Sequence, residues 1–269
     1  MSAYDRFDHL GKELLQELMK ISPLTATYLG CHQYDHLLPL PSPESDFQSQ
    51  KLFHSTIAKL DELNKTELDE NCLLDLELLK WSSSLSDFFL DEVKRYRLGG
   101  YALEYFSGSL HPLFSREFAP LETRVMSIIG RLEGAGDFLE KSKPAYEVPV
   151  EIFIEEHVAG CPAAVEFIDN IVETVTPQIS ETLGKDLSKA AQTAKKHLFE
   201  FENWLIKEVM PRVGMNFALG KEHFTELIKL RRLGLNVDEI RALGEECFAQ
   251  LQQACEEEAE RIAPGQGIE

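Results

Sequence analysis

The sequence has few cysteines, no long apolar run and no leader-like start. Only five of its 269 residues are cysteines, and none of them forms a Cys-x-x-Cys pair of the kind that holds a metal or a redox disulfide. No run of about 18 apolar residues occurs, which excludes a transmembrane helix. The first residues lack the basic-then-apolar order of a signal peptide. Scattered cysteines of odd number suit a reducing compartment, so the sequence predicts a cytoplasmic protein.

Basic residues are also scarce relative to acidic ones. Lys and Arg number 27 against 46 Asp and Glu, which gives a formal net charge of −19. Affinity for nucleic acid comes from Lys and Arg side chains that neutralise phosphates, and an anionic membrane surface repels negative charge. The composition therefore predicts no nucleic-acid partner and no membrane partner. With 43% hydrophobic residues, 16 Gly and 12 Pro, the chain is neither disordered nor fibrous.

What the sequence does contain is helical periodicity along most of its length. The clearest apolar stripe follows a 4-3-4-3-4 spacing and consists of Leu187, Ala191, Ala194, Leu198, Phe201 and Leu205. This spacing predicts a helix near the centre of the fold over 187–209, with Leu198, Phe201 and Leu205 facing the core. No alternating strand run of convincing length occurs. The prediction is an all-α protein, a multi-helix array of antiparallel and irregularly packed helices.

The chain is predicted to form a single helical region over 1–269, with an internal subdivision. A helical N-terminal part covers 1–98, an irregular middle with short helices covers 99–183, and long C-terminal helices cover 184–269. The last residues form no stabilising closing element, so we expect the chain to be the N-terminal part of a longer protein.

Several helix boundaries are predicted from local signals. The run from Glu67 to about Arg97 has the periodicity of one long helix. Pro149 and Pro162 suit first-turn positions, where the missing N–H costs nothing. Asn236 followed by Glu239 predicts a capping box at the start of the last helix.

No motif in the sequence predicts catalytic, cofactor-binding or metal-ligating residues. The nucleophile elbow, the phosphate-binding loop, the dinucleotide-binding loop and the His-Glu-x-x-His zinc motif are all missing. His32 and His36 have ligand-like spacing with Asp35 between them, but a proline-flanked loop does not hold them on one face. We therefore favour a solvated or hydrogen-bonding loop over a metal site there.

One cluster of residues suggests a binding cleft. It consists of His111, Arg116, Arg124, Tyr101 and Tyr105. Two arginines and a histidine beside aromatic residues would suit an anion-accepting cleft in an irregular segment. The alternative is structural, with the arginines capping main-chain carbonyls and pairing with the acidic surplus.

Three stretches together carry a family resemblance. The first is Pro23-Leu24-Thr25-Ala26-Thr27-Tyr28-Leu29-Gly30, followed by His32 and Tyr34-Asp35. The second is His111-Pro112-Leu113, followed by Phe118-Ala119-Pro120 and Arg124. The third is Leu219-Gly220-Lys221-Glu222-His223-Phe224, followed by Asn236-Val237-Asp238-Glu239-Ile240 and Leu243-Gly244. In this order they resemble the domain-of-unknown-function family numbered 885.

The resemblance implies a role for this chain within a larger enzyme. Full-length members resemble zinc metallopeptidases, and their His-Glu motif lies in a C-terminal half. This chain would then be the helical portion that forms one wall of a cleft for a peptide or small-molecule substrate. Its partner would be the C-terminal half of the same protein, which alone would bind zinc to polarise a carbonyl and activate water. No family ligand can be carried over onto a residue of this chain.

Two other functions stay open. The main alternative is a stand-alone helical binding or scaffold protein without catalytic activity. A metal-free hydrolase with paired carboxylates has the least support, because no isolated carboxylate pair in an apolar setting is visible.

Overall fold

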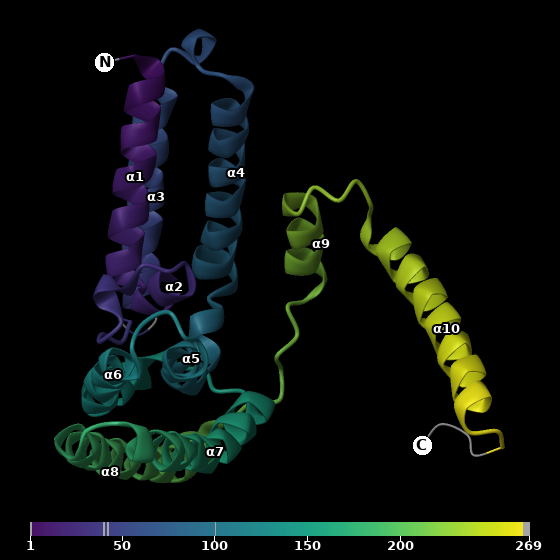
Figure 1. Ribbon diagram of the computed structural model, residues 1–269. Helices are drawn as coiled ribbons and strands as arrows, with labels where there is room; N and C mark the ends of the chain where they lie inside the picture. The colour runs from purple at the N-terminus through teal and green to yellow at the C-terminus, as the bar shows by residue number, and fades with distance from the viewer. Residues whose placement is uncertain (1, 40, 42, 100, 266–269) are drawn as a thin grey trace. The chain divides into compact units, whose positions relative to one another are not determined.

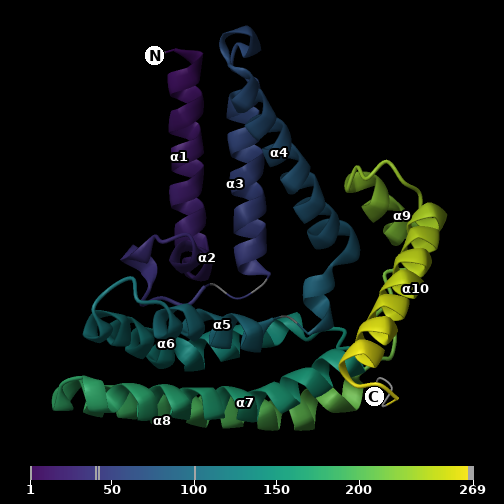
Figure 2. The ribbon, with the colours of Figure 1, turned by 45° about the vertical axis from the view of Figure 1, so that its right-hand side comes forward.

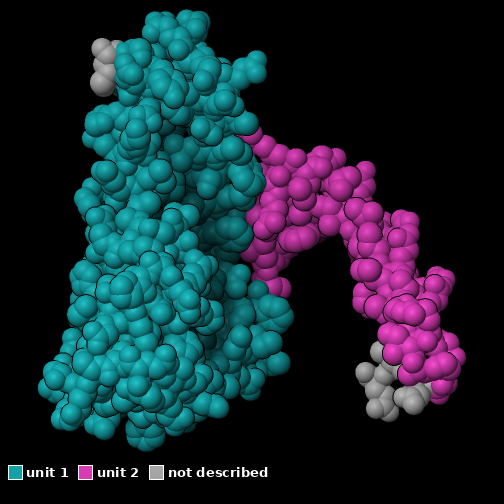
Figure 3. Space-filling model, in the orientation of Figure 1, with its two compact units in different colours: residues 1–217 teal, residues 218–269 magenta. Residues whose placement is uncertain are grey.

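The computed structural model describes residues 2–39, 41, 43–99 and 101–265. The chain forms two compact units, Met1–Phe217 and Ala218–Glu269, which Figure 3 colours teal and magenta. The all-α prediction is confirmed, since the β structure in the described ranges is limited to an isolated bridge between Val150 and Gly214. The subdivision after residues 98 and 183 stays a prediction.

An upright bundle of three helices forms the N-terminal part of unit 1 (Figures 1 and 2). Its helices are α1 (Ala3–Ile21), α3 (Glu44–Asp61) and α4 (Glu70–Asp87). At the start of α1, Ser2 Oγ accepts a hydrogen bond from the Asp5 amide at 3.1 Å, and the Asp5 carboxylate accepts one from the Ser2 amide at 3.0 Å. This capping box satisfies two amides that the helix itself leaves unpaired. A small core lies between the helices and contains Ala3, Leu60, Leu63, Leu68, Cys72 and Leu76.

Four further helices form two layers at one end of this bundle. They are α5 (Ala102–Ser115), α6 (Leu121–Ser142), α7 (Glu151–Val175) and α8 (Glu181–Trp204). In Figure 2, α5 and α6 lie in one layer, and α7 and α8 lie in the layer beneath. The main core fills the space between the layers. It includes Leu198, Phe201 and Leu205, which are 0%, 2% and 0% exposed, so the prediction for this stripe is confirmed.

Short helical segments connect the longer ones. They are α2 (Pro23–Tyr28), the 3-10 helices His32–Tyr34, Lys65–Glu67, Arg95–Leu98, Lys143–Ala145, Thr176–Gln178 and Met210–Arg212, and the π-helices Phe88–Val93 and Leu205–Val209.

The middle of the chain is more regular than its prolines predict. Pro112 lies inside α5 and Pro162 lies inside α7, a helix of 25 residues. The expectation of short helices with Pro162 in a first turn is therefore wrong, and Pro149 lies two residues before α7 begins. An internal proline costs about 3 kcal/mol, because it removes one hydrogen bond and crowds a carbonyl. Seven buried residues of α7, together with the buried Pro112 in α5, show that packing outweighs this cost.

A buried arginine ties the N-terminal segment to the main core. Arg131 on α6 is 0% exposed. Its Nε donates to the carbonyl oxygen of Leu37 at 3.1 Å, its Nη1 to that of Ser109, and its Nη2 to Thr27 Oγ1 at 2.7 Å. Burial lowers the pKa of Arg131 to about 10, and the negative charge of Asp35 partly offsets this effect. The side chain stays charged at neutral pH, and it cross-links segments far apart in the sequence.

The loop that contains His32 and His36 belongs to the same network. Asp35 is buried and accepts a hydrogen bond from Thr27 Oγ1 at 2.6 Å, while its other oxygen lies 2.9 Å from His32 Nδ1. A Cβ atom at position 130 would lie 2.7 Å from the carbonyl oxygen of His36, so Gly130 permits the close approach of this loop to α6. The predicted hydrogen-bonding role of the loop is confirmed at His32.

Unit 2 contains α9 (Lys221–Leu230) and α10 (Val237–Ile262). The predicted capping box is present, with Asn236 Oδ1 3.0 Å from the Glu239 amide and the Asn236 amide 2.7 Å from Glu239 Oε2. Ile228 is the one buried hydrophobic side chain among the described residues of this unit. Several large apolar side chains of α10 are exposed, namely Leu243, Phe248, Leu251 and Ile262. None of the described helices has the length and apolar content that crossing a membrane requires.

Candidate functional site

The chain that follows α4 forms one wall of a pocket in unit 1. Instead of continuing to Arg97 as predicted, the α-helix ends at Asp87 and becomes the π-helix Phe88–Val93. Phe88 and Leu90 are both buried, although residues two positions apart do not share a face of an α-helix. The wider π-helical turn lets both side chains reach the interior, which explains why the prediction of one long helix is wrong. Such turns are frequent at functional sites.

A strained residue completes this wall. Lys94 has φ 52° and ψ 41°, in the left-handed region that favours glycine. A non-glycine residue there costs about 1–3 kcal/mol and persists only where its surroundings fix it. The reversal at Lys94 leads into the 3-10 helix Arg95–Leu98, so that Arg95 is directed back toward the pocket.

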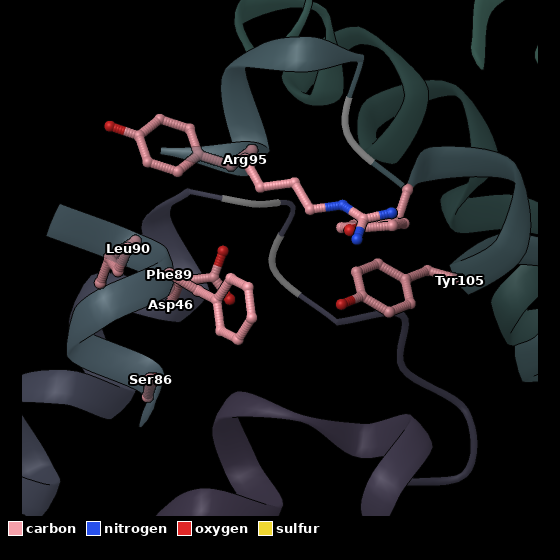
Figure 4. Close-up of a pocket in the computed structure, with 8 residues that line it drawn as sticks. Asp46, Ser86, Phe89, Leu90, Arg95 and Tyr105 are labelled. Carbon is pink, nitrogen blue, oxygen red and sulfur yellow. The ribbon is translucent and has the colours of Figure 1, made fainter. Parts of the chain in front are cut away.

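The pocket has a volume of about 400 Å³ and is largely aromatic. Its lining consists of Asp46, Ser86, Phe89, Leu90, Arg95, Tyr96, Tyr101 and Tyr105. These residues come from α3, α4, the two short helices after it and the start of α5. Figure 4 shows the guanidinium of Arg95 beside Tyr105 and the carboxylate of Asp46 beside Phe89. Small-molecule sites have volumes of about 300–1,000 Å³ and combine apolar walls with a few polar groups, which is the pattern here.

Arg95 is held by aromatic rings. Its guanidinium carbon lies 5.5 Å from the centre of the Tyr101 ring and 5.7 Å from that of Phe153. Arg97, two residues on, pairs with Glu147 at 2.5 Å, whereas Arg95 forms no ion pair with any carboxylate of the described residues. In an acidic chain, this arginine is therefore oriented by its aromatic neighbours. It also interacts with the Tyr101 hydroxyl, and the guanidinium has five N–H donors, so others can be presented to a ligand.

Two tyrosines of the pocket, Tyr101 and Tyr105, are neutral donors. Burial raises the pKa of Tyr101, and the nearby Arg95 partly offsets this rise. Burial also raises the pKa of Tyr105, and the negative charge of Asp46 adds to the effect. Both phenols are thus protonated at physiological pH and able to donate a hydrogen bond to a bound molecule.

Two further cavities extend the pocket along α5. Arg95 and Tyr101 also line a cavity of about 80 Å³, and its opposite wall includes Glu104 and His157. These last two residues in turn line a cavity of about 310 Å³ between α5 and α7. Because neighbouring cavities share side chains, the three form a row along one face of α5.

A buried histidine in this row is fixed from both sides. His157 Nδ1 lies 2.9 Å from the hydroxyl of Tyr146, and its Nε2 lies 3.4 Å from a carboxylate oxygen of Glu104. Burial, followed by the charge of Glu104, holds the pKa of Tyr146 well above its ordinary value, so its hydroxyl is a donor. Burial is the largest influence on the Glu104 carboxyl and raises its pKa, but the hydrogen bond from His157, a backbone hydrogen bond and the electrostatic attraction of His157 together outweigh it, so the pKa is lowered overall. With both ring nitrogens occupied, His157 shapes the cavity wall and has no free nitrogen to act as a base.

The five residues predicted to line a cleft lie in different places. Tyr101 and Tyr105 line the pocket, with ring centres 5.9 Å apart. The His111 ring lies 6.3 Å from that of Phe167, and the Arg116 guanidinium lies 4.9 Å from the Tyr28 ring. The buried Arg124 donates to the carbonyl oxygens of Leu113, Phe114 and Ala119. The structure thus brings the two tyrosines together at the pocket and places His111, Arg116 and Arg124 elsewhere.

Sequence reasoning missed the charged residues of the pocket. One signal was present for Arg95, because Lys94-Arg95-Tyr96-Arg97 is a basic, aromatic run in a strongly acidic chain. No local signal marks Asp46, which reaches the pocket from the first turn of a different helix.

The described residues do not fit a zinc site. No group of three or more His, Cys, Asp or Glu side chains among them could hold a metal ion. We expect the chain to retain no stoichiometric zinc and to hydrolyse no short peptides by itself, because tight binding needs three or four ligands already close together. Metal analysis after dialysis against a mild chelator tests this. About one zinc per chain, or turnover that chelation abolishes and zinc restores, would contradict it.

Comparison with known proteins identifies a family but no activity. A family model described as a bacterial protein of unknown function (DUF885) matches residues 23–268. A solved structure described as that of a candidate lipoprotein of unknown function from Shewanella oneidensis is similar, with a TM-score of 0.76 and 18% sequence identity. The similarity covers 96% of this chain and 48% of that one, so this chain spans about half the length of its structural relative. No curated protein sequence gives a significant match.

Proposed function

This chain belongs to the DUF885 family of bacterial proteins of unknown function, and we propose that it is the helical, ligand-binding portion of a longer hydrolase-like protein. Its ligand would be a peptide or a small molecule that carries an apolar or aromatic group. The row of cavities along α5 is the observation that carries the proposal, because five segments of unit 1 converge on an aromatic pocket with few polar groups.

The hydrolytic chemistry would come from outside the described residues. In the zinc-dependent peptidase that the family resemblance implies, a C-terminal half of the same protein would supply the metal and the base. The exposed apolar side chains of α10 support a further packing partner of this kind. We also propose a cytoplasmic location, on the ground of five free cysteines.

A pocket-filling substitution tests the proposed binding site. Ser86 is exposed on α4 and lines the pocket, so Ser86→Phe should occlude it. Ser82→Phe is the matched control, because Ser82 is exposed one turn earlier on the same helix and does not line the pocket. The probe is the neutral N-acetyl-phenylalanine amide, and its binding is followed by saturation-transfer NMR. We expect binding to the natural chain and to Ser82→Phe, and at least a tenfold loss in Ser86→Phe, equivalent to about 1.4 kcal/mol.

The same experiment distinguishes a ligand-binding function from the alternative, a helical scaffold protein. A helical scaffold without a ligand site predicts no saturation transfer to the probe in any of the three proteins. Equal binding to the two phenylalanine variants would place the ligand outside the pocket and overturn the proposal.

A further inference from the structure

The pocket holds opposite charges on different sides. Arg95 approaches from the 3-10 helix beside Tyr105, and Asp46 approaches from the first turn of α3 beside Phe89 (Figure 4). Phe89, beside Asp46, and Leu90 contribute apolar surface to the same lining. A ligand that satisfied both charges would need an anionic and a cationic group attached to an apolar body.

The Arg95 end suits a carboxylate. The planar guanidinium presents its donors in a fork that matches two carboxylate oxygens. Stacking against Tyr101 and Phe153 restricts the side chain before any ligand arrives, which reduces the entropy that is lost on binding. Tyr101 and Tyr105 keep their protons at neutral pH and add donors on the same side of the pocket.

The Asp46 end suits an ammonium group. The Asp46 carboxylate lines the pocket beside Phe89 (Figure 4), and its negative charge adds to the rise in the pKa of Tyr105. An ionised carboxylate has about four acceptor positions. It can therefore accept hydrogen bonds from a ligand ammonium group while it keeps its contacts with the protein.

We propose that this pocket recognises a zwitterion of amino-acid size, whose carboxylate binds Arg95, whose ammonium group binds Asp46 and whose side chain packs on Phe89 and Leu90. This inference rests on the proposed ligand-binding function and specifies the chemistry of the ligand. The pocket volume, about 400 Å³, lies near the lower end of the range for small-molecule sites and favours a ligand of this size.

Four related probes measure the contribution of each charge. They are L-phenylalanine, its amide, N-acetyl-L-phenylalanine and the neutral N-acetyl amide, each titrated by calorimetry into the natural chain. We expect the zwitterion to bind tightest. Loss of either charge should weaken binding about tenfold, because a hydrogen bond to a charged group contributes about 1.5 kcal/mol or more.

Two variants assign the charges to residues. In Arg95→Gln, L-phenylalanine and its amide should bind alike, because the carboxylate has lost its partner. In Asp46→Asn, L-phenylalanine and its N-acetyl form should bind alike. Arg97→Gln and Glu44→Gln are the controls, since each lies on the same short helix or helix turn but outside the lining, and both should keep the natural order of affinities.

The outcomes distinguish this inference from the function on which it rests. Equal affinity of the natural chain for all four probes, with loss of binding in Ser86→Phe, would overturn zwitterion recognition and leave the ligand site intact. No binding of any probe would overturn both. Since the comparison among probes uses the natural chain, it remains decisive even if a variant fails to fold.

Discussion

Replacing Arg131 with methionine is expected to destabilise the protein by about 3–5 kcal/mol. The side chain is fully buried, and its removal leaves three acceptors without their donor, those of Leu37, Ser109 and Thr27. Each unsatisfied buried group costs about 1–3 kcal/mol. The buried Asp35 carboxylate also loses the nearby positive charge that partly compensates for its burial. The free energy of unfolding in urea, followed by circular dichroism, measures the effect.

A matched substitution distinguishes the loss of this hydrogen-bond network from the loss of any arginine. Arg6 is exposed on α1, so Arg6→Met should change the unfolding free energy by less than about 0.5 kcal/mol. Arg131→Lys should also be strongly destabilised, because an ammonium group cannot reproduce the planar fork of three donors. A cost below about 1 kcal/mol for Arg131→Met would show that the network does not hold the N-terminal segment to the core.

Replacing Phe201 with alanine is expected to cost about 3–5 kcal/mol. Phe201 is 2% exposed, and its ring centre lies 5.9 Å from that of Tyr146 and 5.4 Å from that of Trp204. Truncation removes the transfer free energy of the ring and leaves a cavity among side chains that cannot collapse fully. The same urea titration measures the loss.

The neighbouring Phe199 provides the control on the same helix. It is 63% exposed, so Phe199→Ala should cost less than about 0.5 kcal/mol. If the two alanine variants were equally stable, the assignment of Phe201 to the core would be wrong.

The buried network also gives a structural meaning to the first family-like block. Within Pro23 to Asp35, Thr27 and Asp35 belong to the hydrogen-bonded chain that leads to Arg131. The His32 ring, 2.9 Å from Asp35, stacks on Phe118 of the second block with ring centres 3.7 Å apart. These residues thus connect the first and second blocks, and their role in this structure is packing and hydrogen bonding.

The sequence by itself determined the helical class, the central stripe and the last capping box. Each depends on interactions within a few residues of the chain. The stripe through Leu198, Phe201 and Leu205 follows from helical periodicity. The cap at Asn236 follows from a side chain and an amide three residues apart. Rules that involve only neighbouring residues hold in whatever way the rest of the chain folds.

Tertiary structure decided where the helices continue through prolines and how the pocket is assembled. Pro112 and Pro162 remain inside helices because burial of whole helix faces outweighs their local cost. The pocket depends on a π-helical turn, a left-handed Lys94 and a charge from a distant helix, Asp46. Such a site forms where segments meet, and the free energy that holds its strained backbone comes from packing over the whole unit. Local patterns mark Tyr101, Tyr105 and the basic run around Arg95, but none of them brings these residues together with Asp46, so the pocket as a whole could be found only in the folded chain.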